Sequence, residues 1–140
     1  VRTYHGVRYY NDSIASSPSR TTAGLRSFKE KVILIAGGYD KHIPFDDLGC
    51  EIVEHVKLLV LCGATAEKIR AAVEAAPNYK VGCPEIVMVS PFTAAVETAR
   101  DRAVEGDVVT LSPACAAFDQ FKNFMERGKT FKAIVNSWEE

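Results

Sequence analysis

The chain has 140 residues, enough for one domain with a substantial buried core and too few for two ordinary domains. Hydrophobic residues make up 47% and charged residues 25%, the proportions of a folded globular protein rather than a disordered one. A formal net charge of -1 lacks the basic surplus that nucleic acids or anionic membranes select, so we expect neither as a partner.

The longest apolar run, residues 56–64, is far shorter than the roughly 20 residues that a membrane-spanning helix needs. The opening segment, VRTYHGVRYY, has no charged leader followed by an apolar stretch, so we expect no secretory signal and a cytoplasmic setting. The cysteines are scattered without a Cys-x-x-Cys pair, so we expect reduced structural thiols and neither a zinc site nor a redox site. They are Cys50, Cys62, Cys83 and Cys115.

Strand patterns recur along the chain. The first strand is predicted at residues 7–12, and four more are predicted at residues 32–38, 56–63, 85–90 and 107–113. Three of these runs are almost continuously apolar, which is typical of strands that helices cover on both faces.

Segments with the residue spacing of helices lie between most of these strands, and a long loop is expected at residues 76–85. Three sets of apolar residues have helical spacing, which predicts amphipathic helices. Alternation of strand and helix predicts a Rossmann-like α/β three-layer sandwich, with a mostly parallel sheet of about six strands and helices on both faces. The three sets are Phe45, Leu48, Ile52 and Val56; Phe92, Val96, Ala99 and Ala103; and Phe131, Ile134, Val135 and Trp138.

Serine-proline pairs predict where helices begin. Ser17, Ser90 and Ser112 are each followed by proline, and serine at the N-cap with proline at the first helical position is a common helix start. The third pair places Cys115 at the start of a helix, and Thr65 is expected to cap another. In a parallel sheet such starts gather at the carboxyl edge of the strands, where backbone N–H groups and helix dipoles favour anions.

Familiar nucleotide-binding loops are missing. Residues 37–41, GGYDK, lack the spacing of a phosphate-binding loop, and no G-x-G-x-x-G follows the first strand. Polar residues at the strand ends remain: Asp12, Lys41 and Ser112 could face one crevice if the sheet is parallel. Aspartate there could hold ribose hydroxyls or a cation's water, and lysine could hold a carboxylate or phosphate. Ordinary turn chemistry explains Asp12 equally well.

Four segments together resemble the C-terminal domain of the Mur ligases. They are YYNDSIASSPSRT (residues 9–21), VILIAGGYDK (32–41), VKLLVLCGAT (56–65) and GDVVTLSPACAAFDQFKNFMERGKTF (106–131), of which the last is the most specific. Their order and spacing match over essentially the whole chain. The resemblance implies that residues 1–140 form one domain, the amino-acid-binding and cleft-closing third domain of a three-domain ligase. The N-terminal and central ATPase domains are then absent from this chain.

The resemblance also implies a reaction in peptidoglycan precursor synthesis. ATP and Mg²⁺, bound mainly by the central domain, would activate the carboxylate of UDP-MurNAc-L-alanine as an acyl phosphate, which the amine of D-glutamate then attacks. The other domains of the same enzyme are the implied protein partners of a monomeric, cytoplasmic ligase. We expect the isolated chain to be inactive, and no catalytic or metal-binding residue is assigned within it.

Roles in D-glutamate binding follow from the resemblance by position. Lys41 matches the lysine that binds a D-glutamate carboxylate, and Phe124 matches an aromatic residue of the amino-acid pocket. Ala117 and Phe118 fall at the pocket wall. Ser16 stands where many members have threonine and keeps the hydroxyl. Without the resemblance, the spacing of Phe124 from Phe121 would favour a place in the core for both.

The expected site also has a nucleotide side, and two of its positions differ from the family pattern. Asp12 and Ser13 match the nucleotide side of the cleft. Ile14 replaces a lysine, and Ala117 stands where several members have serine. Because two polar contacts are thus missing, we expect Lys41 to be the dominant carboxylate anchor.

Two other functions stay open from the sequence. One is a related Mur ligase or folate-extending ligase domain with another amino-acid specificity. The segment of residues 112–124 favours D-glutamate over this alternative. The other is a non-catalytic domain that binds a nucleotide or acidic metabolite.

Overall fold

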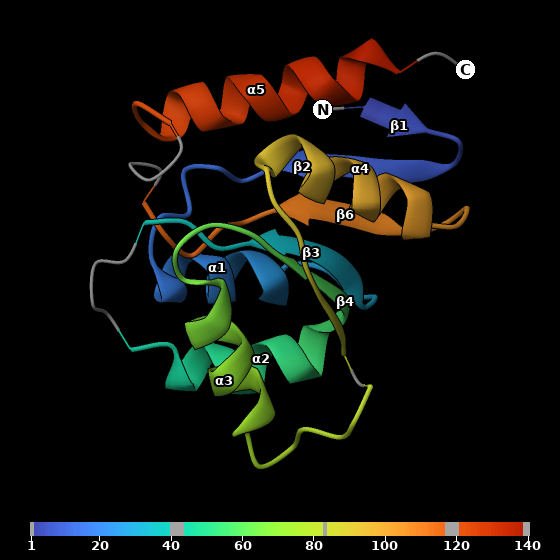
Figure 1. The fold of residues 1–140 in the computed structure, drawn as a ribbon. Helices are drawn as coiled ribbons and strands as arrows, with labels where there is room; N and C mark the ends of the chain where they lie inside the picture. The colour runs from blue at the N-terminus through green and yellow to red at the C-terminus, as the bar shows by residue number, and fades with distance from the viewer. Residues whose placement is uncertain (1, 40–43, 83, 117–120, 139–140) are drawn as a thin grey trace.

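A computed structural model of the chain describes residues 2–39, 44–82, 84–116 and 121–138 (Figure 1). Six strands and five helices alternate along these ranges. The strands are β1 (Arg2–Tyr4), β2 (Val7–Asn11), β3 (Val32–Ala36), β4 (Val56–Leu61), β5 (Glu85–Met88) and β6 (Val108–Leu111). The helices are α1 (Pro18–Arg26), α2 (Asp46–His55), α3 (Ala66–Glu74), α4 (Phe92–Arg102) and α5 (Phe124–Ser137).

All the strands belong to one sheet with the order β1-β2-β6-β3-β4-β5. Only β1 runs antiparallel to its neighbour, while β2, β6, β3, β4 and β5 pair in parallel. In the centre, Val109 of β6 pairs with Tyr9 of β2 on one side and Ile33 of β3 on the other. The predicted parallel α/β sandwich is therefore confirmed.

Helices cover both faces of this sheet, and each face has its own core. Figure 1 shows α4 and α5 on the upper side and α1, α2 and α3 on the lower side. All five residues of β3 are buried, with Leu34 packed toward α1–α3 and Ile35 toward α4 and α5. Since neither face of β3 meets water, its continuous apolar run has a physical reason.

Local helix signals were less reliable than the strand pattern. α1 begins at Pro18 with Ser17 at the N-cap position, as predicted, although the Ser17 side chain makes no capping hydrogen bond. α4 begins at Phe92 with Pro91 and not Ser90 at its N-cap position, after a cis peptide between Ser90 and Pro91. Val56 is the first residue of β4 rather than a helical residue, because α2 ends directly before it. The helix expected after Ser112, with Cys115 at its start, is wrong: residues 112–116 are irregular, and α5 begins at Phe124.

The parallel strands present their carboxyl ends at one edge of the sheet. β2, β3 and β6 are neighbours there, so the residues that follow them emerge side by side. Helices long and apolar enough to cross a membrane do not occur in the described part of the chain.

Candidate functional site

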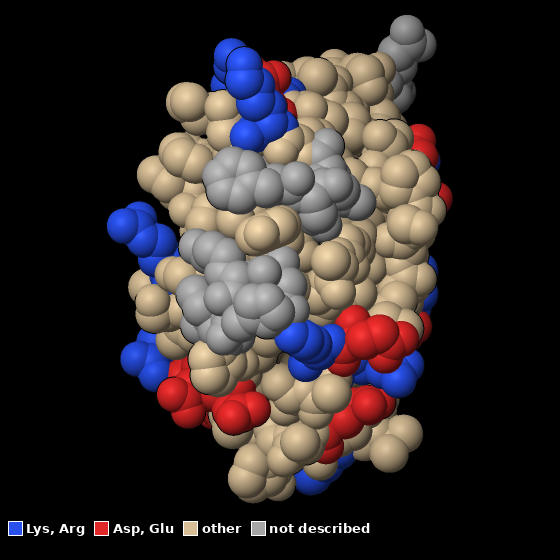
Figure 2. Space-filling model, turned by 60° about the vertical axis from the view of Figure 1, so that its left-hand side comes forward, with Lys and Arg blue, Asp and Glu red and all other residues tan. Residues whose placement is uncertain are grey.

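Three segments leave the carboxyl edge of the sheet and form the candidate site. The β2 exit is residues 12–17, the β3 exit is residues 37–39, and the β6 exit is residues 112–116. Figure 2 shows the face to which this edge belongs, with charged residues of both signs around its rim and mostly uncharged residues in its described centre.

Backbone hydrogen bonds join the three exits to one another. The bonds run from Ala114 N to Ala15 O (3.0 Å), from Gly37 N to Pro113 O (3.0 Å) and from Tyr39 N to Ala116 O (2.8 Å). Each exit is therefore bonded to at least one other.

Asp12 is the first residue of the β2 exit, and its carboxylate is half-buried beside α1. Its Oδ2 accepts a hydrogen bond from the Ser112 hydroxyl (2.9 Å), and the backbone at Gly24 comes so close that a Cβ there would lie 2.8 Å from Oδ2. Burial raises the pKa of Asp12, although the hydrogen bond from Ser112 and the charge of Arg20 act in the opposite direction. The carboxylate is thus held in one orientation at the edge of the sheet.

We expect Asp12→Asn to raise the melting temperature of the chain at pH 7 by about 1–3 °C. Because the folded pKa of Asp12 lies above its ordinary value of 3.8, ionisation disfavours the folded state, and this penalty grows as pH rises through the two pKa values. Below both values the carboxyl is neutral in either state, so the gain should vanish in acid. Thermal denaturation at several pH values measures it.

The matched control for this prediction is Asp101→Asn, since the Asp101 side chain is 65% exposed and pairs with Arg100 at the protein surface. It should show no gain at pH 7. A gain in Asp12→Asn that persisted undiminished in acid would contradict the role of ionisation.

Ser13 follows Asp12 but points into the protein. Its hydroxyl donates to the carbonyl oxygen of Phe124 (2.7 Å) and accepts from Nε of Arg127 (3.0 Å). Ser13 therefore joins the β2 exit to the first turn of α5.

A groove of about 310 Å³ lies between the β2 exit and α5. Phe124 forms part of its wall and is 37% exposed, whereas Phe121 packs its ring against Phe92 at 5.1 Å. The interpretation that both phenylalanines belong to the core is therefore wrong for Phe124. The groove is lined by Asn11, Ser13, Ile14, Phe124, Met125, Gly128, Lys129 and Lys132.

Thr65 braces the β3 exit from the side of α3. Its hydroxyl accepts a hydrogen bond from Gly38 N (3.0 Å) and lies 3.1 Å from Sγ of Cys115. Thr65 stands at the N-cap position of α3, but its side chain makes no capping hydrogen bond. The predicted N-cap position is thus confirmed, but the hydroxyl bonds to the neighbouring exits and not to the helix.

Comparison with known proteins decides the family. A family profile described as "Mur ligase, glutamate ligase domain" matches residues 1–115. The chain belongs to this family. A protein named UDP-N-acetylmuramoylalanine--D-glutamate ligase from Clostridium botulinum (strain Okra / Type B1) is 56% identical over 137 residues, and one of the same name from Clostridium novyi (strain NT) is 55% identical over 137 residues. Each alignment covers 98% of this chain, which spans 30% of the relative's length.

A solved structure shares the fold of this Mur ligase domain. It is a domain described as coming from a UDP-N-acetylmuramate:L-alanyl-gamma-D-glutamyl-medo-diaminopimelate ligase of Haemophilus ducreyi 35000HP. The TM-score is 0.55 over 95% of each chain, at 13% sequence identity. At that identity the likeness concerns the fold alone.

Three of the expected D-glutamate-binding residues of this Mur ligase domain, Lys41, Ala117 and Phe118, lie outside the described residues, so their roles remain predictions. The described segments that lead to them end at Tyr39 and Ala116, which share a backbone hydrogen bond of 2.8 Å. Ser16 is half-buried in the β2 exit, and its role is also still a prediction.

The sequence interpretation missed Arg127, and it expected Thr65 only as a helix cap and not as a partner of the exits. Arg127 shares one stripe of α5 with Phe131 and Val135, at spacings of four residues, and all three are buried. A charged residue on an apolar helix stripe is the signal that could have identified it. For Thr65 no comparable signal exists, because its partners come from other segments.

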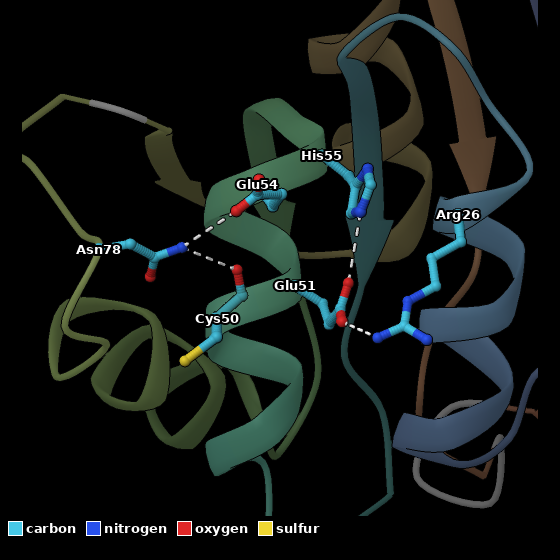
Figure 3. Close-up of polar contacts among 6 residues, drawn as sticks. All are labelled: Arg26, Cys50, Glu51, Glu54, His55 and Asn78. Atoms are coloured by element: carbon cyan, nitrogen blue, oxygen red, sulfur yellow. Dashed lines mark hydrogen bonds and ion pairs between the residues drawn. The ribbon is translucent and has the colours of Figure 1, made fainter.

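A second polar cluster of the Mur ligase domain lies on α2, and Figure 3 shows it. The Glu51 carboxylate accepts a hydrogen bond from Arg26 of α1, and its Oε2 lies 3.3 Å from Nε2 of His55. The hydrogen bond from Arg26, together with the charges of Arg26 and His55, holds the pKa of Glu51 below its usual range. Asn78, in the long loop after α3, donates to the Cys50 carbonyl oxygen at 3.3 Å. These contacts join α1, α2 and that loop, and none involves an exit of the candidate site.

Proposed function

We propose that the chain is the amino-acid-binding, cleft-closing domain of a three-domain UDP-N-acetylmuramoylalanine--D-glutamate ligase. The observation that carries the proposal is 56% identity, over 98% of this chain, to a relative of that name. The bonded exits at the carboxyl edge of the sheet support it, because ligands of open α/β sheets bind at that edge.

The proposed reaction forms an amide bond in peptidoglycan precursor synthesis. ATP transfers its γ-phosphoryl group to the carboxylate of UDP-MurNAc-L-alanine, giving ADP and an acyl phosphate. The amine nitrogen of D-glutamate attacks the acyl carbon, the bond to the phosphate oxygen breaks, phosphate leaves and the nitrogen loses a proton. Holding the amine and the acyl phosphate in line, away from water, accounts for much of the rate of such a step.

In this proposal the β3 and β6 exits lead to the amino-acid side of the cleft. Lys41 pairs with a carboxylate of D-glutamate, a role that suits a mobile ammonium group. Phe124 provides an apolar wall, as its exposed ring in the groove beside the β2 exit allows. Ser16, Ala117 and Phe118 complete the amino-acid side.

Asp12 serves the nucleotide side. Its carboxylate, oriented by Ser112, can accept a hydrogen bond from a nucleotide hydroxyl. Ser13 belongs to the same side and positions α5 through the hydrogen bond from its hydroxyl to the Phe124 carbonyl oxygen. Groups of three His, Cys, Asp or Glu side chains that could hold a metal ion do not occur within the described ranges. In this proposal Mg²⁺ and most of ATP are bound by the other domains of the ligase. We propose a monomeric, cytoplasmic enzyme in which this chain cannot turn over alone.

A chimera tests the proposal. The chain replaces the matching segment of the Clostridium botulinum relative, and phosphate release from ATP is measured. We expect release only when both UDP-MurNAc-L-alanine and D-glutamate are present. Release that instead required L-lysine or a diaminopimelate would assign another specificity, and no release with any amino acid would overturn the proposal.

Lys41→Ala in the chimera should raise the KM for D-glutamate about 10- to 100-fold, because an ionic hydrogen bond of about 1.5–3 kcal/mol is lost. Steady-state kinetics with varied D-glutamate measure the change. Lys31→Ala is the matched control, since Lys31 is exposed and directly precedes β3, at the opposite edge of the sheet. If Lys41→Ala left both KM and kcat unchanged, Lys41 would not be the anchor.

A further inference from the structure

Arg127 is buried within the protein although arginine carries a permanent charge. It is the fourth residue of α5 and is 2% exposed. Long charged side chains are seldom fully buried unless their polar atoms are bonded, so the surroundings of this guanidinium require an explanation.

The guanidinium group of Arg127 bonds to two of the three exits. Nε donates to the Ser13 hydroxyl (3.0 Å) and Nη2 donates to the Ser13 carbonyl oxygen (2.7 Å), both in the β2 exit. Nη1 donates to the Cys115 carbonyl oxygen (2.8 Å) in the β6 exit. A single side chain of α5 therefore spans the two segments.

α5 comes close enough for these bonds because the residue after Arg127 is glycine. A Cβ at Gly128 would lie 3.0 Å from Nδ2 of Asn11 and 3.2 Å from Cβ of Ser13. The third exit is also near, since a Cβ at Gly38 would lie 3.5 Å from Nη1 of Arg127. The guanidinium thus lies at the base of all three exits.

We propose that Arg127 is a positioning residue for D-glutamate binding, an inference that rests on the proposed function. Its guanidinium sets the distance between the β2 exit, which contains Ser16, and the β6 exit, which precedes Ala117 and Phe118 in the sequence. Because it is buried, Arg127 acts through these segments and does not touch the ligand.

The geometry of arginine suits this role better than that of lysine. A planar guanidinium offers five N–H donors in fixed directions, whereas an ammonium group offers its donors from one atom. The three hydrogen bonds of Arg127 described above leave from three different nitrogens toward three acceptor atoms. Lysine would keep the charge but could not reach both exits in the same way.

Kinetics of the chimera described above test the inference. We expect Arg127→Lys to raise the KM for D-glutamate about tenfold or more, with the KM for UDP-MurNAc-L-alanine changed by less than about twofold. The control is Val135→Ala, which removes a buried side chain from the same stripe of α5 without touching an exit. It should lower the melting temperature and leave the KM for D-glutamate unchanged.

Hydrogen exchange in the 140-residue chain gives a second readout that does not depend on activity. Two amides report on the bonds between exits: Ala114, bonded to Ala15, and Tyr39, bonded to Ala116. Their exchange should accelerate in Arg127→Lys by more than in Val135→Ala. This comparison remains available if the chimera carrying Arg127→Lys is too unstable for kinetics.

The outcomes separate the two proposals. An unmodified chimera that does not use D-glutamate overturns the proposed function and this inference with it. An active chimera in which Arg127→Lys and Val135→Ala have the same KM for D-glutamate overturns the inference alone. Equal acceleration of exchange in the two variants likewise shows that Arg127 only stabilises the fold.

Discussion

Gly37→Ala is expected to lower the free energy of unfolding by more than about 3 kcal/mol, which is among the larger effects of a single substitution. Gly37 directly follows β3 with φ +108, a conformation that side chains disfavour. A Cβ there would lie 1.9 Å from the Cys62 carbonyl oxygen, which is backbone and cannot move aside as a side chain can. Gly37 N also donates to Pro113 O, so a displacement of Gly37 would disturb the β6 exit as well.

Gly106→Ala is the matched control for Gly37→Ala. Gly106 has a similar φ of +94, but no atom lies within 4 Å of the position that its Cβ would take. We expect the free energy of unfolding of this variant to fall by only about 1–2 kcal/mol, the cost of placing a side chain in this backbone conformation. Urea denaturation followed by the fluorescence of Trp138, the single tryptophan, measures both changes. Equal losses in the two variants would mean that the contact with Cys62 is unimportant.

The layers of the fold could be predicted from the sequence because they depend on patterns that extend over many residues. Five strands were expected at their observed places, and the continuous apolar run of β3 correctly indicated helices on both faces. β1 was missed because it has only three residues, Arg2–Tyr4, of which two are polar. Its pairing with β2 depends on the turn at His5 and Gly6, both with positive φ.

Helix starts were harder to predict because the same side chain can serve two purposes. Ser112 and Pro113 have the chemistry of an N-cap and a first helical residue. In the fold, the Ser112 hydroxyl instead donates to Asp12 and lies 3.2 Å from the hydroxyl of Thr21, residues that are 100 and 91 positions away in sequence. A local signal cannot reveal such partners.

The sequence predicted that the segments after β2, β3 and β6 share one edge of the sheet, but it did not predict which residues brace that edge. Asp12 and the segments that lead to Lys41 and Ala117 share the carboxyl edge, because β2, β3 and β6 are parallel neighbours. Which residues brace that edge depends on tertiary contacts. Arg127 and Thr65 reach the exits from α5 and from the start of α3, whose placement no spacing of residues specifies.

α5 is the element whose docking matters most to these supports, and it lies beyond residue 115, where the match to the family profile ends. Phe131 is its largest fully buried side chain, at 0% exposure, in the core shared with α4 and the sheet. We expect Phe131→Ala to lower the free energy of unfolding by about 3–5 kcal/mol, because a cavity replaces a ring that packs against the sheet. Urea denaturation of the 140-residue chain measures the loss.

Met125→Ala is the control on the same helix, since Met125 is 56% exposed. Its loss should stay within about 0.5 kcal/mol, as for most surface substitutions. A loss below about 1 kcal/mol for Phe131→Ala would show that α5 does not close this face of the sheet in solution. In that case Arg127 could not hold the β2 and β6 exits at a fixed distance, because its bonds to Ser13 and Cys115 require α5 to be docked.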